Sequence, residues 1–231
     1  MVWGSRANKY LLLDKYLAIL YVLVTYISWQ LHELGHWVAC KVLGINAIFG
    51  FNVWKIVSSH GSSTLAITAG PLTNLILAVI GLVLMRRTGS LLVARLGLFL
   101  LISNSFMDIG AALASIKHVI VYHDWSSEPT WKFALTPVFL VLMYVGVKVY
   151  REKLRLRTLL IMAALTAALG IIAIPMDIVT WSCIEHKMSI CSPVAGISAI
   201  VVVVNVVVAV MTIAYIVAYR EQLGAIKLQQ A

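Results

Sequence analysis

The chain has 231 residues, of which 61% are hydrophobic and only 12% are charged, and its mean hydropathy is +0.96. This composition excludes an ordinary soluble domain and predicts a single membrane domain over residues 1–231. The net charge of +9 fits the positive-inside bias of a membrane protein; no basic face with interleaved aromatic residues accompanies it, so we expect membrane lipids and no nucleic acid as partners.

Six apolar segments are each long enough to cross the hydrocarbon core of a bilayer. They cover residues 16–43, 65–85, 96–114, 133–149, 159–181 and 194–219. We therefore predict an all-α polytopic membrane protein with about six transmembrane helices. The polar stretch from Met1 to Lys9 is short and does not predict a cleavable signal peptide.

The first span contains the sequence His32-Glu33-Leu34-Gly35-His36. Residues i and i+4 share one face of a helix, so both imidazoles can bind one metal ion. Glu33 then stands beside the metal's water as a candidate general base. The alternative is two polar histidines at a helix end. Ionisable side chains inside a membrane helix are costly and by default functional, so we predict a metal site here.

Residues 44–64 connect the first two spans and contain a β-branched and aromatic run at 49–57, followed by a turn-like sequence at 58–61. This pattern predicts a short β segment of one or two strands between helices 1 and 2. A strand edge at the membrane boundary could pair with an extended peptide. The alternative is an interfacial loop anchored by Trp54.

The next two spans add polar groups at the level of the histidines. Residues 69–74 of the second span read Ala-Gly-Pro-Leu-Thr-Asn, in which Gly and Pro permit a kink and a close backbone approach. An interhelical packing kink is the alternative. His32 and His36 lie roughly 24–30 Å into their span, and Asp108 lies roughly 18 Å into its own. Asn74 enters the same half of the bilayer from the opposite direction.

A catalytic zinc site needs three protein ligands plus water, so two histidines leave one ligand to be found. Asp108 and Asp177 both lie in spans and reach the required depth, and depth alone does not separate them. Cys40 follows His36 by one turn, but it lies roughly 12 Å from His32 along the helix axis. We expect Cys40 to be a small buried apolar residue rather than a ligand.

Taken in chain order, these segments resemble the site-2 protease family of intramembrane zinc metallopeptidases. The resemblance covers roughly residues 16–115, the three-helix catalytic core of the family, and leaves residues 116–231 as accessory helices 4–6. The family's third-ligand Asp usually follows an Asn and a Pro and precedes a Gly. Here Asn104 lies four residues before Asp108, no Pro intervenes, and Ile109 separates Asp108 from Gly110.

The resemblance implies one Zn²⁺ per chain, held by His32, His36 and Asp108, because chain order favours Asp108 over Asp177. Glu33 would activate the zinc-bound water, and Asn74 would help to bind the substrate backbone. The strands within 44–64 would present an edge to the unwound substrate. The implied activity is metalloendopeptidase hydrolysis within or near transmembrane segments, with a transmembrane protein or a membrane-bound peptide remnant as substrate.

Two other functions stay open. One is a catalytically inactive relative that binds membrane helices, which the irregular segment around Asp108 permits. The other is a metal transporter, in which His and Asp form a relay site. Transport predicts polar residues that continue across the bilayer, whereas these cluster in one half.

We expect a multi-pass protein of the plasma membrane, and the Lys and Arg residues predict that both termini lie in the cytoplasm. Thirteen of the 18 fall on the side of the termini, and the other five are Lys41, Lys55, Lys117, Lys132 and Lys187. Members of the resembled family usually have the reverse orientation. Cys183 and Cys191 share one loop, which the charge distribution places outside, where a disulfide and two free thiols are both possible.

Overall fold

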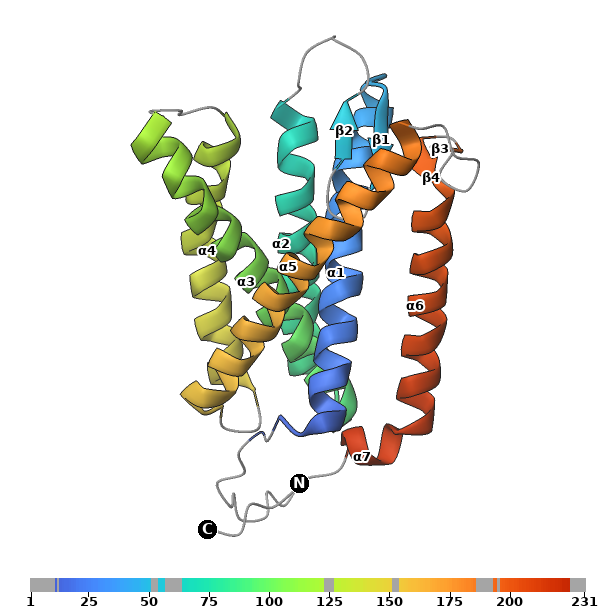
Figure 1. Ribbon diagram of the computed structural model, residues 1–231. Helices are drawn as coiled ribbons and strands as arrows, with labels where there is room; N and C mark the ends of the chain where they lie inside the picture. The colour runs from blue at the N-terminus through green and yellow to red at the C-terminus, as the bar shows by residue number, and fades with distance from the viewer. Residues whose placement is uncertain are drawn as a thin grey trace, which may run out of the picture.

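The computed structural model describes residues 11, 13–50, 54–56, 64–122, 127–150, 154–185, 193–194 and 196–224. It confirms an all-α polytopic membrane architecture with a small β segment (Figure 1). In chain order the helices are α1 (Lys15–Val42), α2 (Thr64–Arg87), α3 (Leu91–Tyr122), α4 (Ser127–Val149), α5 (Leu156–Glu185), α6 (Ala199–Ala218) and α7 (Arg220–Gly224). Five of them are long and apolar enough to cross a membrane, and α4 adds a shorter apolar stretch at Phe133–Val149.

The helix α1 carries the histidine motif and has defined ends. The carboxylate of Asp14 caps its first turn by accepting a hydrogen bond of 3.0 Å from the backbone N–H of Leu17. At the other end the chain leaves the helix through Gly44, whose φ of +70° places it in the left-handed region that favours glycine. This turn leads the chain directly into the first strand.

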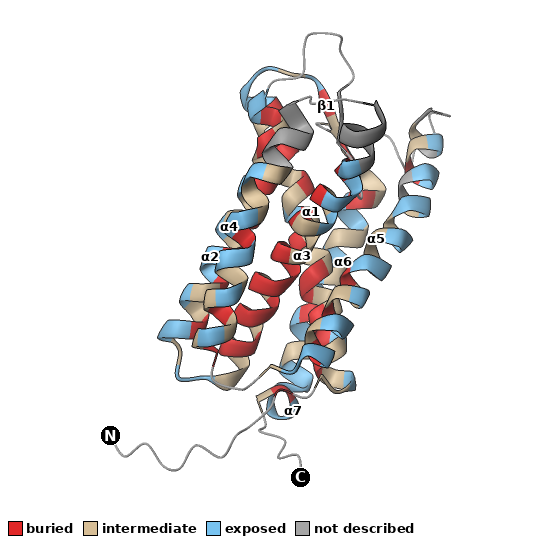
Figure 2. Ribbon diagram, turned by 90° about the vertical axis from the view of Figure 1, so that its left-hand side faces the viewer, coloured by how far each residue is buried: buried red, intermediate tan, exposed pale blue. Residues whose placement is uncertain are grey.

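The helices α1, α2 and α3 form the packed centre of the molecule (Figure 2). Large apolar side chains such as Leu20, Leu98 and Phe99 are fully buried there. A Cβ at Gly81 of α2 would lie only 2.4 Å from the carbonyl oxygen of Gly97 on α3. Glycine at these two positions therefore lets the two backbones approach closely, which is a common way for membrane helices to gain packing contacts.

Four short strands form one sheet at the end of α1 that follows the histidine motif (Figure 1). They are β1 (Ala47–Phe49), β2 (Trp54–Ile56), β3 (Pro193–Val194) and β4 (Ile197–Ser198). Their spatial order is β2-β1-β4-β3, with β1 antiparallel to β2 and parallel to β4. The predicted strands between helices 1 and 2 are therefore present as β1 and β2.

The second half of this sheet corrects two predictions. The β structure is not confined to the connection between helices 1 and 2, because β3 and β4 come from the segment just before α6. The sixth span also begins at Ala199 rather than at residue 194. Gly196, at φ +85°, makes a tight turn between β3 and β4, and its carbonyl accepts a hydrogen bond of 2.8 Å from the Phe49 N–H. Pairing with a distant strand thus overrides the apolar pattern that favoured a helix.

The helices α5 and α6 lie at the periphery, with most of their side chains exposed (Figure 2). In a bilayer these apolar faces contact lipid. The Val-rich α6 is attached to α1 through Asn205, which accepts a hydrogen bond from the Tyr26 hydroxyl at 2.9 Å and donates one to Gln30 Oε1 at 3.0 Å. Asn205 thus joins the two helices by hydrogen bonds, as polar residues in membrane bundles commonly do.

Candidate metal and substrate site

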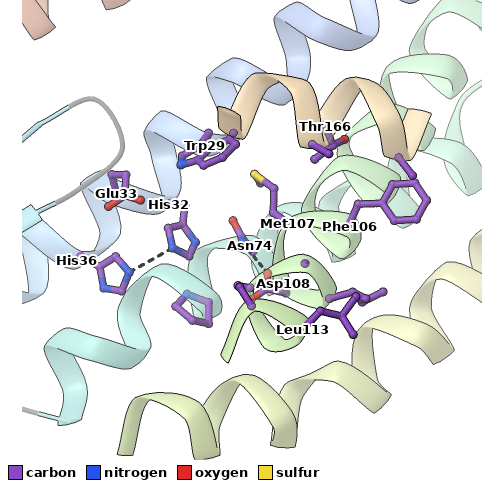
Figure 3. Close-up of a pocket in the computed structure, with 18 of the residues that line it drawn as sticks. Trp29, His32, Glu33, His36, Asn74, Phe106, Met107, Asp108, Leu113 and Thr166 are labelled. Carbon is purple, nitrogen blue, oxygen red and sulfur yellow. Dashed lines mark hydrogen bonds between the residues drawn. The ribbon is translucent and has the colours of Figure 1, made fainter. Parts of the chain in front are cut away.

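His32 and His36 point toward each other from one face of α1, as their spacing predicted (Figure 3). Their Nε2 atoms are 3.2 Å apart, and the ring planes are inclined by 80°. Two nitrogen ligands at about 2.0–2.1 Å from a tetrahedral zinc ion are separated by roughly 3.3 Å. The two nitrogens therefore have the spacing of two neighbouring ligands on one ion.

The other ring nitrogen of His36 has a partner that fixes the orientation of this side chain. His36 Nδ1 lies 2.7 Å from the backbone carbonyl oxygen of Ala66 on α2. A carbonyl can only accept, so Nδ1 carries the proton and donates it, which leaves the lone pair on Nε2. Metal-binding histidines almost always donate their second N–H in this way, and His36 is 7% exposed.

Gly70 on α2 keeps space open at the Nε2 atoms of the two histidines. A Cβ at this position would lie 2.2 Å from His36 Nε2 and 2.7 Å from His32 Nε2. Nearby, a Cβ at Gly35 of α1 would lie 2.3 Å from the Thr73 hydroxyl oxygen. The two helices thus cross in close contact at the motif, and the predicted close backbone approach of the segment 69–74 is confirmed.

Asn74 and Asp108 form a second polar pair across the pocket (Figure 3). Asn74 Nδ2 donates a hydrogen bond of 2.5 Å to Asp108 Oδ2, and both residues are buried, with exposures of 1% and 2%. The carboxylate fixes the orientation of the amide, because only the NH₂ group can donate to it. Asn74 Oδ1 is buried and finds no hydrogen-bond partner within the described part of the chain.

A pocket of about 860 Å³ joins the two pairs. His32, Glu33, His36, Asn74 and Asp108 all line it, so the structure brings every predicted site residue to one cavity. Glu33 is only 6% exposed. Apart from these residues the walls are mainly apolar side chains of α3 and α5, as expected for a cavity that binds a largely apolar ligand.

The structure does not bring three ligands together. Among the described residues, no group of three His, Cys, Asp or Glu side chains is close enough to hold a metal ion. The histidines form one pair, and Asp108 is engaged with Asn74. The side chains of Asp177, Cys183 and Cys191 lie outside the described part. Cys40 is a fully buried free cysteine in a separate cluster with Ala47 and Ala66, as predicted.

Sequence reasoning missed the contribution of α5 to the pocket wall. Ala163, Thr166, Ala167 and Gly170 line the pocket at the i, i+3, i+4, i+7 spacing of one helix face. A stripe of small residues in an otherwise bulky span was the available signal. The partner of His36 at Ala66 is a backbone carbonyl, which no side-chain pattern could have revealed.

The fold and this pocket define an integral membrane protein with a buried polar site beside the sheet end of a three-helix centre. Comparisons of the chain with protein-family models, with curated proteins and with solved structures find no match.

Proposed function

We propose that this protein is an intramembrane zinc metalloendopeptidase of the site-2 protease type, which hydrolyses peptide bonds within or near transmembrane segments. The observation that carries the proposal is the histidine pair on α1. Its Nε2 atoms are 3.2 Å apart and the Nδ1 atom of His36 is bonded to a backbone carbonyl. Zinc-binding histidines in proteins have both features.

The spacing of the two histidine nitrogens supports one zinc ion per chain. His32 and His36 would supply the two nitrogen ligands, and Asp108, in the same pocket, would supply the oxygen ligand. A bound zinc ion makes a water molecule more acidic and polarises a peptide carbonyl. Asp177 is the alternative third ligand.

The other pocket residues have roles that follow from their chemistry. Glu33 follows a ligand directly in sequence and is buried in the pocket wall, so its carboxylate would accept a proton from the attacking water and pass it to the leaving nitrogen. Asn74 would hold the carboxylate of Asp108 through its Nδ2 group. Its buried Oδ1 atom would accept a hydrogen bond from a substrate backbone N–H.

The substrate would be a transmembrane protein or a membrane-bound peptide remnant. A helical peptide bond is shielded by its own backbone, so cleavage requires local unwinding, and an exposed strand edge can capture the unwound segment. The strand β1 is flanked by β2 and β4, so an added peptide strand would pair with β2 or β3 at the outer edges of the sheet. Both edges belong to the sheet end of the molecule, where α1 carries its motif.

The protein would reside in the plasma membrane with both termini in the cytoplasm, and the Lys and Arg distribution supports this orientation. The histidine pair and the sheet would then lie toward the outer face.

The alternative is a catalytically inactive relative that binds membrane helices. The engagement of Asp108 with Asn74, away from the histidine pair, favours it. A metal transporter has less support, because the buried His, Asp and Glu side chains among the described residues are Glu33, His36 and Asp108, and all three line the one pocket rather than a path across the membrane.

The test combines zinc content with cleavage of a transmembrane peptide that carries a helix-destabilising residue. Purified protein should contain about one zinc per chain and cleave the peptide. Glu33→Gln should abolish cleavage and retain zinc, because it removes the proton acceptor and keeps the shape of the side chain. Asp108→Ala should release zinc and Asp177→Ala should retain it. Cleavage that survives Glu33→Gln would exclude this mechanism.

A further inference from the structure

Asn104 is a buried polar side chain that the proposed chemistry does not use. It lies on α3, has no exposed surface, and precedes Asp108 by four residues, which is about one helical turn or 6 Å. Its Oδ1 atom is buried and accepts no hydrogen bond from any described residue. A buried amide oxygen without a donor costs roughly 1–3 kcal/mol, so an unpaired acceptor at this position requires an explanation.

Reversing the Asn104 amide does not remove the problem. Its Nδ2 atom donates to the carbonyl oxygen of Leu100 at 2.6 Å and to the hydroxyl oxygen of Ser28 at 3.3 Å. A reversed amide would place two acceptors, Oδ1 and the Leu100 carbonyl, against each other. The orientation is therefore fixed, and Oδ1 needs a donor from elsewhere.

Ser28 leaves the complementary group unused. It faces Asn104 from α1, has no exposed surface, and precedes His32 by one turn. Within the described part of the chain its hydroxyl makes one hydrogen bond, in which it accepts from Asn104, so its own proton has no acceptor. Neighbouring hydroxyls differ: Thr25 donates to the Tyr21 carbonyl at 2.8 Å, and Ser105 donates to the Leu101 carbonyl at 2.8 Å.

An unused donor and an unused acceptor thus lie side by side on facing helices. Buried water typically occupies such places, because one molecule can accept from the hydroxyl and donate to the amide oxygen. We propose that Ser28 and Asn104 bind a buried water molecule between α1 and α3, one turn below the pocket.

The position gives this water a use that rests on the proposed function. His32 and Asp108 lie one turn above Ser28 and Asn104 and both line the pocket. Hydrolysis inside a membrane consumes water where the surrounding lipid supplies none, and the bound molecule is a local source. Below it the rings of Tyr21 on α1 and Phe99 on α3, both fully buried, pack edge to face with their centroids 5.4 Å apart. The site therefore lies between this ring pair and the pocket.

Water-edited solid-state NMR of the whole protein in lipid bilayers tests the proposal without any cleavage assay. With ¹⁵N-labelled asparagine, the rate of magnetisation transfer from water is read at each side-chain amide, and Asn104→Leu identifies the signal of Asn104. Asn205 is the matched control, since it is a membrane asparagine whose two amide atoms bond to Tyr26 and Gln30. Asn74, in the pocket, provides the hydrated reference.

Transfer to Asn104 should be about as fast as transfer to Asn74 and several-fold faster than transfer to Asn205. Ser28→Ala removes one of the two partners of the water, so it should slow transfer to Asn104. Ser103→Ala should not, because the Ser103 hydroxyl bonds to the Leu100 carbonyl at 3.3 Å instead. Transfer to Asn104 as slow as to Asn205 overturns the water site, whatever the protein hydrolyses. The proposed function is tested separately, by the zinc content and by the cleavage assay.

Discussion

The two polar pairs in the pocket are assembled in different ways. His32 and His36 are four residues apart on one helix, whereas Asn74 and Asp108 are 34 residues apart and come from α2 and α3. The helical spacing places the first pair on one face of α1, and a single contact with α2, from the Ala66 carbonyl, fixes the His36 ring. The second pair exists only because α2 and α3 pack closely, as at Gly81 and Gly97. A loss of packing between α2 and α3 should therefore affect the second pair more than the first.

Removing one of the two imidazoles should produce the largest loss of zinc affinity. Structural zinc sites bind with about 10–16 kcal/mol shared among four ligands, so His32→Ala or His36→Ala should weaken zinc binding at least about a hundredfold. Competition with a chromophoric chelator measures the affinity. Val207→Ala is the control, because Val207 lies on α6, which does not line the pocket. Equal affinity in wild type and in both histidine variants would show that this pair does not bind the metal.

A side chain introduced at Gly70 should cause the second-largest loss of zinc affinity. Gly70→Ala places a methyl group 2.2 Å from His36 Nε2, and such overpacking costs typically 1–3 kcal/mol. Zinc affinity should therefore fall roughly tenfold or more. Gly110→Ala is the matched control, since Gly110 also lies on a helix and lines the pocket, but a Cβ there meets no atom within 4 Å. Unchanged affinity in Gly70→Ala would show that the ring positions are not those used to bind zinc.

Substitution of Asn74, which is bonded to Asp108, should have a smaller effect on zinc affinity. The result distinguishes two roles for Asn74. If Asn74 positions the Asp108 carboxylate, Asn74→Ala should lower zinc affinity about tenfold, at the lower end of losses for residues that orient metal ligands. If it contacts only the substrate backbone, zinc affinity should stay constant and the KM for the peptide should rise. Thr73→Val is the control, because the Thr73 hydroxyl donates to the Ala69 carbonyl and lies outside the pocket wall.

The same contrast explains how much of this molecule its sequence predicts. The histidine motif, the first five spans and the strands after Gly44 depend on spacing within one segment, and the structure has a helix or strand at each of them, whereas the sixth span begins at Ala199 rather than at residue 194. The strands β3 and β4, the carbonyl of Ala66 beside His36, and the α5 wall of the pocket depend on contacts between distant segments. Backbone partners and small residues leave little trace in composition, so these features became visible only in three dimensions.

The smallest effect on zinc binding is expected where α6 meets α1, because α6 does not line the pocket. Asn205→Val should leave Tyr26 and Gln30 without their bonds to the amide. Interhelical hydrogen bonds in membranes contribute on average about 0.6 kcal/mol each, so the free energy of unfolding should fall by about 1 kcal/mol in a detergent titration. Val207→Ala, at a position that is 50% exposed, is the control. Zinc affinity should not change, because no residue of α6 lines the pocket. A loss of zinc on this substitution would instead show that the contact with α6 holds the histidine face of α1 in place. The geometry of His32 and His36 would then depend on packing between helices as well.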